Sequence, residues 1–99
     1  GIPTMRRRRA RAMKGRRRLS AGQLPDHALC RGPGNLTMAM GISLAANQLD
    51  LAGDRLFIDD RGGLVEQVQW GPRIGIRVGT DRPWRAWVGG HPAVSASKG

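Results

Sequence analysis

The sequence predicts an α+β fold in which short helices precede a small antiparallel sheet. Good helix formers dominate residues 5–18, apolar residues recur at helical spacing in 26–40, and short strand-like runs separated by turn residues fill 55–95. Helical segments followed by strands are typical of α+β domains. A chain of 99 residues suffices for one small domain, so we expect no separate second domain.

The first part of that domain, residues 1–24, is expected to be a basic helix and loop. A short helix is predicted over 4–13 with Thr4 as its N-cap, and the remainder is predicted to be a mobile loop. Arg7 and Arg11 lie four residues apart, and like charges at this spacing destabilise a helix. An anionic partner would therefore help to order this segment.

Residues 25–54 are expected to form a helical segment. Its predicted elements are a turn at 26–31 and a helix at 34–40, because the Gly-Pro-Gly string at 32–34 interrupts the helical pattern. Gly41 follows the last periodic residue and is the expected C-cap. A polar connection with one helical turn is expected to complete the segment.

Residues 55–95 are expected to form the antiparallel strands. The clearest pattern lies at 73–78, where apolar Ile and Val alternate with Arg and Gly and so occupy one face of a strand. Trp84 and Trp87 belong to another run and are expected to pack in the core. The four predicted strands cover 55–59, 65–68, 73–78 and 84–88.

The positive charge is concentrated at one end of the chain. The net charge is +10, and residues 1–18 hold nine Arg or Lys and no acid, whereas the rest holds eight basic and seven acidic residues. A block of this kind indicates a polyanionic partner, because each phosphate that it neutralises releases counterions. The alternative is a solvated basic tail without a specific partner.

Several classes of protein are disfavoured by the same sequence. Cys30 is the only cysteine, which excludes an internal disulfide and suits a reducing compartment. No uncharged stretch is apolar and long enough to span a bilayer, so no membrane partner is expected. His27, Cys30 and His91 do not have zinc-ligand spacing, and no metal site is expected. No nucleotide-binding loop or catalytic centre can be drawn from the motifs alone.

Four segments closely resemble the C-terminal half of the 3-methyladenine (alkyladenine, methylpurine) DNA glycosylase family. They include Leu-Cys-Arg-Gly-Pro-Gly-Asn-Leu-Thr at 29–37 and Trp-Gly-Pro-Arg-Ile-Gly-Ile at 70–76, with further matches at 82–88 and 90–95. Their order and spacing match as well as their letters, and the resemblance covers nearly all of residues 2–95. It implies the C-terminal half of a single-domain glycosylase fold.

The resemblance also implies a function and a setting. Family members flip a damaged purine out of duplex DNA and hydrolyse its bond to the sugar with an activated water, in base excision repair and without a cofactor. The expected partner is double-stranded DNA containing alkylated or deaminated purines, of the 3-methyladenine or hypoxanthine type. The complete enzyme is expected to be a monomer in a bacterial cytoplasm, associated with the nucleoid.

The family's catalytic glutamate, the aromatic residues that sandwich the flipped base and the intercalating tyrosine lie upstream of the point that corresponds to Gly1. The 99-residue chain contains no tyrosine, and none of its acids occupies the family's general-base position. We therefore expect the chain to correspond to the downstream half of the enzyme and to be inactive alone.

Two catalytic contributions are carried over from the family. A Met-Arg step supplies an arginine that helps to hold the nucleophilic water, and Met5-Arg6 occupies that step here. An arginine beside a buried carboxylate keeps it ionised, and its planar donors fix a water. The main-chain carbonyl of Ile74 is implied as a further ligand of that water. The alternative for Arg6 is a contact with phosphate or solvent, as one of four consecutive arginines.

The DNA contacts implied here combine the basic segment with a glycine. Gly75 follows the carbonyl of Ile74, and a residue without a side chain lets the backbone N–H approach a phosphate. A β-bulge or tight packing would also explain a glycine at this position. The expected DNA-binding residues of the basic segment are Arg7, Arg8, Arg9, Arg11, Lys14, Arg16, Arg17 and Arg18.

The main alternative is a non-catalytic, arginine-rich protein that binds RNA or DNA, and a second is a structural fragment without activity. An upstream Glu-x-Tyr strand with an aromatic pocket would favour the glycosylase. The only lysines are Lys14 and Lys98, so this half offers no obvious Schiff-base nucleophile, and simple hydrolysis is preferred to a lyase step.

Overall fold

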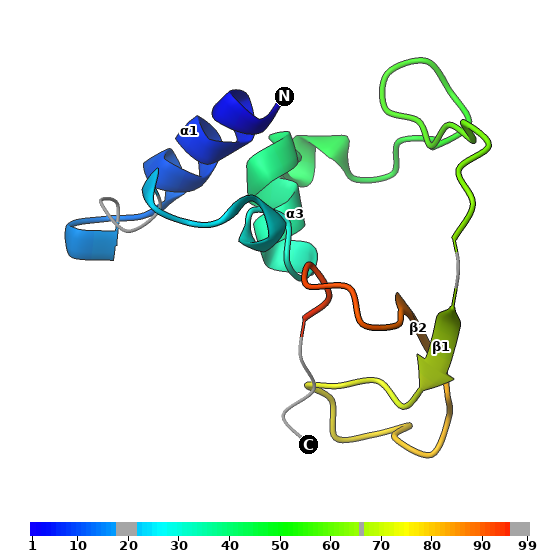
Figure 1. Cartoon of the computed structure of the whole chain (residues 1–99). Helices are drawn as coiled ribbons and strands as arrows, with labels where there is room; N and C mark the ends of the chain where they lie inside the picture. The colour runs from blue at the N-terminus through cyan, green and yellow to red at the C-terminus, as the bar shows by residue number, and fades with distance from the viewer. Residues whose placement is uncertain (18–21, 66, 96–99) are drawn as a thin grey trace. The chain divides into compact units, whose positions relative to one another are not determined.

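The computed structural model describes residues 1–17, 22–65 and 67–95. It forms two compact units, residues 1–61 and 62–99, and each is considered by itself. Within the described residues, helices α1 and α3 and two short 3-10 helices lie in the first unit, and a two-stranded antiparallel sheet lies in the second (Figure 1). The predicted α+β class, with short helices and a small antiparallel sheet, is confirmed.

Helix α1, Ile2–Ala12, begins two residues before the predicted start. Pro3 lies in its first turn, where a missing N–H costs nothing because the first helical N–H groups have no partner within the helix. The prediction of Thr4 as N-cap is wrong, since Gly1 occupies that position. The Thr4 hydroxyl instead accepts a 3.2 Å hydrogen bond from Nη2 of Arg7.

The predicted loop over 14–24 is only partly observed. Residues 16, 17 and 22 are helical, which differs from the prediction, and residues 18–21 lie outside the described part of the chain. The DNA contact predicted at Arg18 lies outside the described residues.

The elements of 25–54 follow the glycine and proline pattern closely. A 3-10 helix η1, Asp26–Ala28, precedes helix α3, Pro33–Met40, as predicted from the break at 32–34. Gly41 ends α3 in the left-handed region with φ of 71°, which confirms the predicted C-cap. A second 3-10 helix, η2, Leu44–Ala46, supplies the expected helical turn.

The apolar core of the first unit is thin. Helix α1 packs against α3 (Figure 1). The 3-10 turn η1 contacts α1 through hydrogen bonds that Arg9 of α1 donates to its C-terminal end. Leu29 and Ala39 are the buried apolar residues of this core, with 1% and 0% of their surfaces exposed. Arg9 is buried with them at 4% exposure. Polar contacts by arginine must therefore contribute much of the adhesion between these elements.

The sheet of the second unit pairs β1, Val68–Gly71, with β2, Arg85–Val88. The strands are antiparallel, with Val68 opposite Val88 and Gly71 opposite Arg85. A Cβ at Gly71 would lie 2.9 Å from Cη2 of Trp87, so glycine is required where the indole crosses β1. The predicted strand at 84–88 is confirmed, and the one predicted at 65–68 is displaced toward the C-terminus.

The strands predicted at 55–59 and 73–78 are wrong within the described residues. Gly75 and Gly79 have φ of 76° and 74°, and these left-handed residues bend the chain out of the extended conformation that alternation suggested. Residues 55–59 form bends and irregular backbone, and Ile58 is 80% exposed. An alternating pattern makes a strand only where a neighbouring strand can pair with its backbone.

Candidate nucleic-acid interface

Arg6 lies on the side of α1 that faces the segment before η1. Its Nη2 atom is 2.6 Å from Oδ1 of Asp26, and its Nη1 atom donates to the carbonyl of Leu24. The Arg6 side chain is 26% exposed, whereas that of Asp26 is 64% exposed. Arg6 also lines a pocket of about 400 Å³ together with Arg7 and Gly22. Its guanidinium is thus held in place with donors left over for another group.

Arg9 is the most buried charged residue of the described chain. One guanidinium nitrogen, Nη1, donates to the carbonyls of Leu29 at 2.6 Å and Ala28 at 3.0 Å. The Ala28 carbonyl also accepts a 3.4 Å bond from the Arg31 N–H, and carbonyls at the end of a helical turn favour a cationic donor. For Arg9 the structure does not support the predicted phosphate contact, because this donor group already caps η1 beneath the surface.

Arg8 makes a similar contact at the end of α3. Its Nη1 atom donates to the carbonyl of Ala39 at 3.2 Å, and a Cβ at Gly41 would lie 3.1 Å from its Cζ atom. Three of the four consecutive arginines therefore bond to backbone carbonyls of the segments that follow α1. The role of these arginines as donors to backbone carbonyls was not predicted from the sequence. The three-residue spacing of Arg6 and Arg9 does indicate that these two lie on one face of the helix.

The other basic residues that the structure describes in this segment are exposed. Arg7 bonds only to Thr4 of its own helix, and Arg7 and Arg11, four residues apart, lie on one side of α1. No described residue forms a hydrogen bond or ion pair with Arg11, Lys14 or Arg17. These side chains are exposed parts of the predicted interface and use no donor within the described chain, whereas the exposed Arg8 bonds to Ala39.

Ile74 and Gly75 lie in the second unit, in a bend between the strands. Ile74 is 42% exposed, and no described atom would come within 4 Å of a Cβ at Gly75. The glycine is explained by its φ of 76° and not by close packing. No described residue forms a backbone hydrogen bond with the Ile74 carbonyl or the Gly75 N–H. Because Arg6 belongs to the other unit, a water shared with Ile74 stays a prediction.

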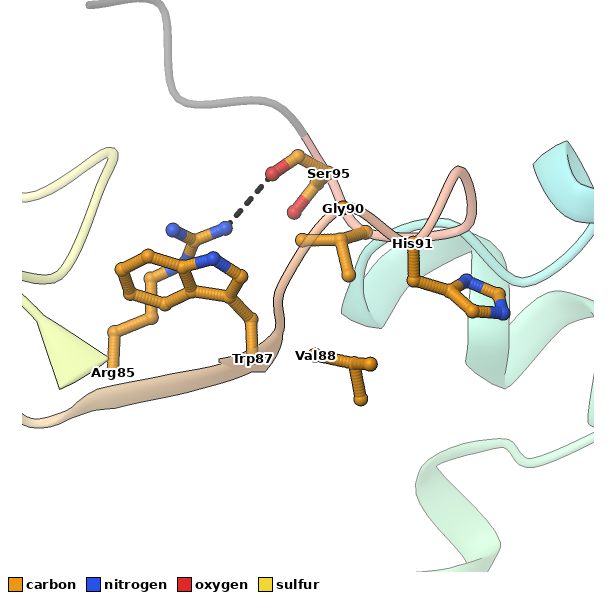
Figure 2. A pocket seen from close by; sticks show the side chains of 7 residues that line it. Arg85, Trp87, Val88, Gly90, His91 and Ser95 are labelled. Atoms are coloured by element: carbon orange, nitrogen blue, oxygen red, sulfur yellow. Dashed lines mark hydrogen bonds between the residues drawn. The ribbon is translucent and has the colours of Figure 1, made fainter. Parts of the chain in front are cut away.

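Trp84, just before β2, and Trp87, within β2, differ in exposure. Trp84 is 66% exposed beneath the guanidinium of Arg82, 4.7 Å from the ring centroid, so its expected core packing is wrong in this structure. Trp87 is partly buried and carries Arg85 at 4.5 Å. Figure 2 shows Arg85 stacked on Trp87 and hydrogen-bonded to the carbonyl of Ser95. The Nη2–O distance of this bond is 2.8 Å, and the three residues line a pocket of about 250 Å³.

Other kinds of site find no support among the described residues. Within 1–17, 22–65 and 67–95, no three His, Cys, Asp or Glu side chains gather as metal ligands would. In the same ranges no helix has the length and apolar character needed to cross a membrane. The accessible cationic side chains and the open backbone at Ile74–Gly75 are the features that could meet a nucleic acid.

The comparisons with known proteins agree on one family. Residues 1–92 match the family model for methylpurine-DNA glycosylase. A Burkholderia lata protein named "Putative 3-methyladenine DNA glycosylase" is 45% identical over 89 residues, which are 84% of this chain and 43% of the relative. A Mycobacterium sp. (strain KMS) protein of the same name is 42% identical over 71 residues, or 72% of this chain and 35% of the relative.

A Mycobacterium tuberculosis (strain H37Rv) protein of that name is 45% identical over 69 residues, which cover 70% of this chain and 34% of the relative. The chain thus spans less than half the length of the curated relatives that it matches. No solved structure matches it. Since the family model covers residues 1–92 and the identity reaches 45% in the same region, the chain belongs to the methylpurine-DNA glycosylase family.

Proposed function

We propose that this chain is the DNA-contacting, C-terminal half of a glycosylase that removes alkylated or deaminated purines from duplex DNA. The substrates are of the 3-methyladenine and hypoxanthine type, each flipped from the helix before its bond to the sugar is hydrolysed. The observation that carries the proposal is the match of residues 1–92 to the family model. Base excision repair is the process that this activity serves.

The reaction needs a water that is held and deprotonated beside the sugar carbon. We assign the holding of this water to Arg6 and to the main-chain carbonyl of Ile74, and its deprotonation to a glutamate of the upstream half. The contacts of Arg6 with Asp26 and Leu24 support the first assignment, because a fixed guanidinium can orient a water without reorganising. The proton passes from the water to the glutamate, and the purine leaves as the glycosidic bond breaks.

The family also implies what this chain lacks for catalysis and where the complete enzyme acts. The chain by itself supplies no general base and no aromatic sandwich for the base, so residues 1–99 alone would be inactive. The complete enzyme would act as a monomer on duplex DNA, with no cofactor, in a bacterial cytoplasm at the nucleoid. Gly75 would donate its N–H to a phosphate, in keeping with its open surroundings.

A second function is favoured by the exposed cationic residues alone. Arg11, Lys14 and Arg17 would suit a non-catalytic protein that binds RNA or DNA through phosphate. Such a protein would hold undamaged and damaged duplexes equally and release no base.

The test is a graft in which this chain replaces the segment of the Burkholderia lata relative that it matches over 89 residues. The graft and the parent relative are incubated in excess with a duplex that contains one hypoxanthine, and alkali-labile strand breaks are measured on a gel. We expect lesion-specific breaks from both. A folded graft that binds the duplex yet never cuts it, beside an active parent, would favour the non-catalytic function.

A further inference from the structure

Helix α1 carries basic side chains on two sides that have different surroundings. We infer that Arg6, Arg8 and Arg9 form an internal clamp on the following segments, whereas Arg7 and Arg11 with Lys14 and Arg17 form the surface that binds the phosphates of duplex DNA. This inference deepens the proposed function and rests on its DNA partner. It assigns opposite roles to neighbours within one run of four arginines.

The clamp is defined by its acceptors. Arg9 donates to the carbonyls at the end of η1, and Arg8 donates to the carbonyl of Ala39 near the end of α3. Both sets of carbonyls belong to helix C-termini, whose partial negative charge favours a cation. Arg6 adds the ion pair with Asp26. Arg9 is buried, whereas Arg8 is exposed and the Arg6 side chain is 26% exposed, so a phosphate that reached Arg6 or Arg8 would compete with contacts that hold the unit together.

The outward surface has the opposite property. Arg7 is exposed and bonds only within its own helix, to Thr4, and Arg11 has no interaction with any described residue. Their Cα atoms are separated by about 6 Å along the helix axis, so the two charges repel each other in the unbound chain. Neutralisation by a phosphate removes this repulsion and costs no internal contact.

The occupant that fits this surface is the backbone of duplex DNA. A row of long, separately exposed cations matches a row of phosphates and lacks the shaped pocket that would read a base. Binding through it should be insensitive to sequence and steeply dependent on salt. Lys14 and Arg17 extend the row beyond the helix end, on residues that also lack partners among those described.

The experiment compares two double variants of the whole 99-residue chain. The first, Arg7→Ser with Arg11→Ser, removes two charges from the outward surface. The matched control, Arg55→Ser with Arg61→Ser, removes the same charge from exposed positions elsewhere in the first unit. Duplex affinity is measured by fluorescence anisotropy over a range of salt concentrations, and helix content is measured by circular dichroism.

We expect the outward variant to flatten the slope of log K against log salt by about 1.8, because each lost phosphate contact contributes about 0.9. The control should keep its slope, and both variants should keep their helix content. Equal slope changes in the two variants, or a loss of helix in the outward one, would overturn the inference. A wild-type chain that does not bind duplex at all would instead count against the proposed DNA partner.

Discussion

Replacing Arg9 by Met removes the most buried charged group of the described chain while keeping its apolar stem. Arg9 is 4% exposed and its Nη1 donates to Leu29 and Ala28, at 2.6 and 3.0 Å. Hydrogen bonds from a charged donor contribute about 1.5–3 kcal/mol each, and the two carbonyls would lose this donor. Relief of the desolvation cost of the guanidinium offsets part of that loss. We therefore expect the free energy of unfolding to fall by about 2–4 kcal/mol.

The assay is urea unfolding of the chain followed by far-ultraviolet circular dichroism, with Arg7→Met as the matched control. Arg7 is exposed, and a surface substitution away from special contacts changes stability by no more than about 0.5 kcal/mol. Because Leu29 and Ala39 are the only buried apolar side chains among the described residues of the first unit, the Arg9 variant should lose most of its helical signal in water. Equal urea midpoints for the two variants would refute the reasoning that Arg9 clamps η1.

Three further changes probe other parts of the chain. Gly71→Ala places a methyl group 2.9 Å from Cη2 of Trp87, so the hairpin should open and tryptophan fluorescence should shift to the red. The control Gly63→Ala adds a methyl group with no atom within 4 Å, so its fluorescence spectrum should stay unchanged. In Gly75→Ala the added methyl group has no atom within 4 Å, but the residue must keep a φ of 76°, so the change should cost about 1–2 kcal/mol of local stability and weaken duplex binding. Unchanged duplex affinity would remove Gly75 from the interface. In the active graft, Arg6→Ala should lower single-turnover excision by about 10²–10³-fold with little change in affinity. Reduced affinity with unaltered excision would make Arg6 a phosphate contact.

The helical half of the chain could be predicted well because its boundaries depend on local chemistry. Gly-Pro-Gly at 32–34 and the left-handed Gly41 act on their own neighbours, so their effects are visible in the sequence. The strands could be predicted less well. Alternation at 73–78 is equally visible, but Gly75 and Gly79 bend the chain there, and a strand also depends on a distant pairing partner.

The division of the arginines could not be predicted for a related reason. The sequence shows a charge at each position but not the backbone carbonyls that the charge meets, because those carbonyls come from helix ends 19 to 31 residues away. Helical spacing separates Arg6 and Arg9 from Arg7 and Arg11, but it does not reveal which side is inward. Packing of α1 against α3 decides this, and it depends on the folded chain.

Complementation tests most directly the claim that this chain supplies the DNA-contacting half of a purine glycosylase and not its general base. Residues 1–99 are mixed with the part of the Burkholderia lata relative that the chain does not match, and breaks at hypoxanthine are measured with each part alone and with both. We predict no lesion-specific breaks from either part alone and lesion-specific breaks from the mixture. Breaks produced by residues 1–99 alone, above a no-protein control, would show that a general base lies within this chain and would contradict the account.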